Sequence, residues 1–99
     1  MRTIRFSIAG ESSLADINEI LSEQEERCSE FLDGKVAYQE GKVVTLVTFK
    51  LYDDTTVPNK LILQKKSDKP PRNATRFWEG VMVVSKETAV VVAYRANSP

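Results

Sequence analysis

The chain has 99 residues, no histidine and a single cysteine, Cys28, and its 14 basic side chains balance its 14 acidic ones. This length fits a single domain over residues 1–99 and is too short for a second core. Without histidine there is no Ser-His-Asp or Cys-His catalysis and no histidine-ligated metal, so we expect a protein that is not an enzyme and holds no cofactor or metal. The balanced charge favours neither generic nucleic-acid binding nor attachment to a membrane surface.

The apolar residues are too dispersed for an export signal or a membrane span. The first ten residues alternate and then reach Gly10, without the continuous apolar run of a secretory signal. No apolar run approaches the roughly 20 residues that cross a bilayer. Because a lone cysteine cannot form an internal disulfide, we expect a reducing compartment, and hence a cytoplasmic protein with no membrane partner.

Residues 3–8 alternate between apolar and polar side chains, which predicts a half-buried strand. Ser13 is then a good N-cap, with Asp16 three residues later, close to a capping box. The pattern predicts a helix over 13–32 that ends at Gly34, with a gap in its apolar stripe at residues 24–25. Its stripe consists of Leu14, Ile17, Leu21, Cys28, Phe31 and Leu32.

The rest of the chain predicts strands separated by turns and loops. The strands are expected at residues 35–38, 43–52, 60–65, 76–84 and 89–94, and the loops at 53–59 and 66–74, the latter long, basic and containing two prolines. Residues 96–99 are expected to fray. The fold class is therefore α+β, of order β-α-β-β-β-β-β, with one long helix packed on an antiparallel meander sheet of five to six strands.

This arrangement predicts which side chains meet in the core and which sheet face stays uncovered. The second face of the sheet would carry Val44, Leu46 and Tyr52, so the sheet either curls toward a partial barrel or meets a partner. The helix should bury its apolar stripe on the inner face of the strands. The residues expected to pack together are Leu14, Ile17, Leu21 and Phe31 from the helix, with Phe6, Val47 and Phe49 from the strands.

The two signs of charge are segregated along the chain. Residues 11–33 hold eight acidic side chains against Arg27 alone, whereas residues 60–76 hold six basic ones against Asp68 alone. Basic side chains beside an aromatic residue are what a phosphate backbone with stacking bases would need. The alternative is a solvated loop followed by a tryptophan packed in the core. The candidate partner-binding residues are Lys60, Lys65, Lys66, Lys69, Arg72, Arg76 and Trp78.

The leading hypothesis is a small non-enzymatic protein that acts through macromolecular contact, as an accessory subunit or inhibitor. Its partner would be another protein or a second copy of the chain, because a sheet of this size exposes a strand edge or an apolar face. The alternative is nucleic-acid or nucleotide binding through the basic segment, residues 60–78.

Overall fold

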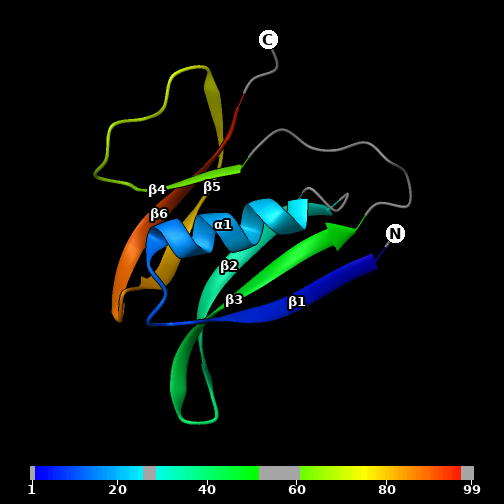
Figure 1. Cartoon of the computed structure of the whole chain (residues 1–99), viewed down its shortest axis with the longest axis vertical. Helices are drawn as coiled ribbons and strands as arrows, with labels where there is room; N and C mark the ends of the chain where they lie inside the picture. Colours follow the sequence, from blue (N-terminus) through cyan, green and yellow to red (C-terminus); the bar gives the residue numbers. More distant parts are fainter. Residues whose placement is uncertain (1, 26–28, 52–60, 97–99) are drawn as a thin grey trace.

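A computed structural model describes residues 2–25, 29–51 and 61–96 (Figure 1). The α+β class and the order of elements are confirmed. No helix in these ranges has the length and apolar character needed to cross a membrane. In chain order the elements are β1 (Arg2–Ala9), α1 (Leu14–Glu25), β2 (Ser29–Gln39), β3 (Lys42–Leu51), β4 (Leu61–Lys65), β5 (Ala74–Val84) and β6 (Glu87–Ala96). Outside the described residues lie Cys28, Tyr52, Lys60, the predicted loop at 53–59 and three of the four predicted C-terminal residues, 97–99.

The strands form two antiparallel three-stranded sheets, so the predicted meander of five to six strands is wrong. Their orders are β1-β3-β2 and β4-β6-β5. The sheets approach each other where β2 contacts β5. Both strands carry a bulge, at Leu32 and at Phe77, and bulges interrupt regular pairing. Between the sheets the Val83 amide donates to the Thr45 hydroxyl at 2.9 Å. At this point the backbone N–H is therefore bonded to a side chain and not to the backbone of a neighbouring strand.

The hairpins β2–β3 and β5–β6 share one plan. Each pairs an 11-residue bulged strand with a 10-residue strand through a two-residue turn. All four turn residues have positive φ, from 50° to 76°, as a type I′ turn requires. The second turn is anchored, because Ser85 and Lys86 donate their backbone N–H groups to the carbonyls of Ser12 and Gly10 at 2.8 and 2.7 Å.

The helix begins as predicted and ends early. Ser13 Oγ accepts from the Asp16 amide at 3.2 Å, and the Ser13 amide donates to Asp16 Oδ2 at 3.3 Å, which is the reciprocal pattern of a capping box. The predicted extension to Leu32 is wrong, because α1 ends at Glu25, where the apolar stripe is interrupted. Gly34, predicted to stop the helix, lies buried within β2.

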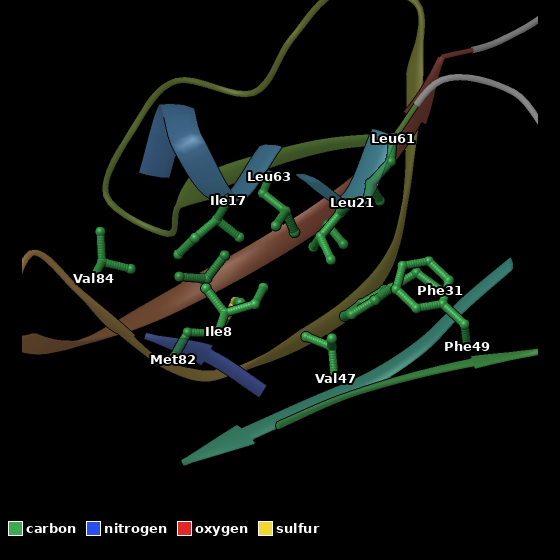
Figure 2. Close-up of a cluster of buried hydrophobic side chains, with 12 residues drawn as sticks. Ile8, Ile17, Leu21, Phe31, Val47, Phe49, Leu61, Leu63, Met82 and Val84 are labelled. Carbon is green, nitrogen blue, oxygen red and sulfur yellow. The ribbon is translucent and has the colours of Figure 1, made fainter. Parts of the chain in front are cut away.

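The predicted core residues nevertheless meet, and Figure 2 shows the buried ones. Phe31 reaches the core from β2 rather than from a helix, which is why a helical pattern seemed to continue through it. Burying such a side chain contributes about 1.5–3 kcal/mol. The buried members are Ile17, Leu21, Phe31, Val47 and Phe49, with Leu14 and Phe6 partly buried against them.

The helix also covers an edge of the second sheet. β4 is the outer strand of the β4-β6-β5 sheet and contacts α1. Asn18 donates its amide N–H to the Leu63 carbonyl at 2.9 Å and accepts from the Leu63 amide at 2.7 Å. One side chain thus satisfies both backbone groups of an edge residue, and it blocks strand addition there.

Candidate binding surfaces

The basic candidates lie on the loop that joins β4 to β5 and on the strand residues next to it. All five that the structure describes are exposed: Lys65 at the end of β4, Lys66, Lys69 and Arg72 in the loop 66–73, and Arg76 in β5. The start of this loop is fixed, because the Lys66 amide donates to the Val90 carbonyl at 2.9 Å. The loop therefore presents its charges from an anchored base.

Two of these five charges already have an acidic partner. Glu79 on β5 forms ion pairs with Arg76 at 2.7 Å and with Lys66 at 3.3 Å. The two basic side chains are more than half exposed and Glu79 is 30% exposed, and surface pairs of this kind contribute little to stability. Their effect is on the surface potential, because Glu79 lowers the net positive charge that an anionic partner would meet.

Trp78 packs within the protein and is not presented beside the basic side chains. Its indole Nε1 donates to Asp33 Oδ1 at 3.2 Å, and its ring meets Phe31 edge-on, with centroids 5.2 Å apart. It also lies so close over Gly80 that a Cβ there would overlap the indole. These contacts link β5 to β2, so Trp78 holds the two sheets together.

The exposed aromatic residue of this region is Phe77, which is not among the binding residues predicted from the sequence. Phe77 is the extra residue of the β5 bulge and is 37% exposed. The Arg95 guanidinium lies 4.3 Å from its ring centroid, in cation–π geometry. A bulge shifts side-chain alternation by one residue, and no residue type in the sequence marked its position.

A second surface lies on the β2–β3 hairpin, whose tip extends beyond the rest of the molecule (Figure 1). We call residues 36–43 the arm. Val36 and Tyr38 lie two residues apart, and Tyr38 pairs with Val43 across the hairpin, so the three side chains share one face. They are 37%, 75% and 36% exposed, and they make up half of the large exposed apolar side chains in the described chain.

One side of the arm, at Lys42 and Val43, borders a cleft of about 650 Å³, which we call the basal cleft. Its walls come from the end of β1, the first residues of β3 and the β5–β6 turn. Val43, Val44 and Val83 supply apolar surface, while Lys42 and Lys86 supply positive charge. Gly10 lets these segments meet, since a Cβ there would lie 2.6 Å from the Val43 carbonyl oxygen. Two more cleft residues, Glu11 and Thr88, carry polar groups.

The acidic helix surface is solvent-exposed at Asp16, Glu19 and Glu23, the positions that point away from the core.

The chain matches no protein family model, and neither curated proteins nor solved structures give a match. Function is therefore inferred from the three surfaces themselves.

Proposed function

We propose that this chain is a small, cytoplasmic, non-enzymatic protein that acts through macromolecular contact, as an accessory subunit or inhibitor, and that the arm is its contact surface. The observation that carries this proposal is the exposed apolar face formed by Val36, Tyr38 and Val43. Single exposed apolar residues are ordinary, whereas a group of them on one projecting element is typical of an interface.

The arm's chemistry supports this role. Tyrosine is enriched among the residues that dominate binding energy, because it offers a large rigid apolar ring and one polar group. Tyr38 is 75% exposed, so its ring gains little from the fold of its own chain. Both strands of the arm are paired by backbone hydrogen bonds, and a partner would therefore meet a preorganised surface.

Site-specific photo-cross-linking tests this proposal. A photoreactive amino acid would replace Tyr38 in one variant and Glu19 in a matched control on the exposed face of α1. Each purified variant is irradiated alone and in extract of the native host. We expect a discrete adduct from position 38 that the control does not form, whether the adduct contains a second copy or another macromolecule. Adducts from position 19 alone would show that the arm is not the contact surface.

The second candidate is nucleic-acid or nucleotide binding through the basic segment. It is favoured by five exposed basic side chains on and beside a loop that is anchored at its start, and by the partly exposed ring of Phe77 next to Arg95. A partly exposed aromatic ring beside cations suits base stacking. The ion pairs of Glu79 weigh against it, because a phosphate would compete with that carboxylate for Lys66 and Arg76.

Charge reversal separates this candidate from a solvated loop. The triple variant Lys65→Glu/Lys69→Glu/Arg72→Glu leaves both Glu79 ion pairs intact, so its melting temperature should stay close to that of the parent. If the segment binds phosphates, oligonucleotide affinity falls, and the slope of log K against log salt flattens by about 0.7–0.9 for each lost contact. Lys35→Glu, on β2, controls for a charge reversal outside the basic segment. Unchanged oligonucleotide binding by the triple variant would refute this candidate.

A further inference from the structure

We propose that the partner of the arm is a second copy of this chain, and that Tyr38 of each copy occupies the basal cleft of the other. This inference rests on the proposed function, because it takes the arm as the contact surface, and it adds the identity of the partner. The resulting contact is isologous, with the same surface used by both copies.

The arm and the cleft form one continuous surface. Val43 faces Tyr38 across the hairpin and also lines the basal cleft. The Tyr38 ring and the basal cleft therefore lie next to each other. When two such surfaces meet around a two-fold axis that passes between ring and cleft, the arms lie antiparallel, with Val43 near the axis. Each Tyr38 then reaches the basal cleft of the other copy.

The chemistry of the cleft fits a tyrosine side chain. The apolar surface of Val43, Val44 and Val83 suits the ring, and the Glu11 carboxylate can accept a hydrogen bond from the phenol. The cleft volume of about 650 Å³ exceeds that of a single aromatic ring, leaving room for the neighbouring arm backbone.

The charges of the arm and the cleft are complementary. Glu40 lies in the turn at the tip, while Lys42, which directly follows this turn, and Lys86 line the basal cleft. In the antiparallel arrangement Glu40 of one copy approaches Lys86 of the other, and the two-fold axis produces this pair twice. Within the described ranges neither residue has an intramolecular ion pair, so both charges are available. The backbone of Lys86 is held by its hydrogen bond to Gly10.

Sedimentation equilibrium over a concentration series tests the dimer and its contacts. The variants are Tyr38→Ser, Glu40→Lys, Lys86→Glu and the double variant Glu40→Lys/Lys86→Glu. Tyr38→Ser should weaken dimerisation at least about thirtyfold, the effect of removing a buried aromatic anchor. Each single reversal should weaken it about tenfold, because two attractive pairs become two repulsive ones. The double variant exchanges the charges and should recover most of the loss.

Lys35→Glu is the matched control, because Lys35 is exposed on the strand face opposite Val36, and its dimer affinity should equal that of the parent. Thermal unfolding confirms that each variant folds. A parent chain that stays monomeric up to about 1 mM shows that the partner is not a second copy. The proposed function would still stand in that case if cross-linking at position 38 gives an adduct with another macromolecule. A dimer insensitive to Tyr38→Ser overturns the arm contact. Additive losses in the double variant overturn the pairing of Glu40 with Lys86.

Discussion

Thr45 is the residue at which one substitution tests how the two sheets are joined. Its side chain is fully buried, and its hydroxyl accepts the Val83 amide from the other sheet at 2.9 Å. Thr45→Val keeps the shape of the side chain and removes the acceptor. Leaving a buried N–H unsatisfied costs about 1–3 kcal/mol, and the added methyl returns up to about 1 kcal/mol of burial. We expect a net destabilisation of about 1–2 kcal/mol.

This loss should lower the melting temperature by about 5–10 °C for a domain of this size. Amide hydrogen exchange gives the local readout, since the Val83 N–H should lose protection in the variant. Thr48→Val makes the same chemical change on the opposite face of β3, where Thr48 is half-buried, and should shift stability by less than about 0.5 kcal/mol. If Thr45→Val behaves like Thr48→Val and Val83 keeps its protection, the hydroxyl does not join the sheets.

Three further substitutions test other contacts. Gly80→Ala forces the indole of Trp78 to move, so we expect the free energy of unfolding to fall by about 1–3 kcal/mol. The fluorescence emission of this sole tryptophan should shift to the red, and an unshifted spectrum would contradict the contact. Asn18→Leu removes both side-chain bonds to the Leu63 backbone, and chemical denaturation should show at least about 2 kcal/mol of destabilisation; a neutral result would mean that the β4 edge needs no cover. Lys86→Gly relieves a positive φ of 68° and should raise the free energy of unfolding by about 1 kcal/mol, whereas a decrease would show that the lysine side chain stabilises the turn.

The local patterns in the sequence predicted the elements better than their pairing. Strict alternation located β1, the Ser13 cap located the start of α1, and the turn residues located both hairpins. The end of the helix was missed because Phe31 is spaced like a helical residue while it reaches the core from a strand. A stripe broken at residues 24–25 was the available sign that the helix stops.

The split into two sheets depends on contacts that no local pattern records. The bulges at Leu32 and Phe77 interrupt the pairing within each hairpin, and the bond from Val83 to Thr45 joins residues 38 positions apart in the chain. In the sequence, Thr45 looked like one more residue of an alternating strand. The presence of threonine instead of valine at this position was the only sign that its side chain has a polar role. For the same reason Trp78 was grouped with the basic side chains, although its partners are Asp33 and Phe31.

The two hairpins show why the arm, rather than any other apolar group, is the strongest candidate surface. Both have the same strand lengths and the same turn, yet the β5–β6 turn is bound to the carbonyls of Gly10 and Ser12, whereas a Cβ on Gly41 in the β2–β3 turn would meet no atom within 4 Å. If stability alone decided the fold, both hairpin tips would pack against the rest of the protein, because removing apolar side chains from water is favourable. A tip that keeps Tyr38 and two valines exposed is therefore best explained by a surface outside this chain that receives them.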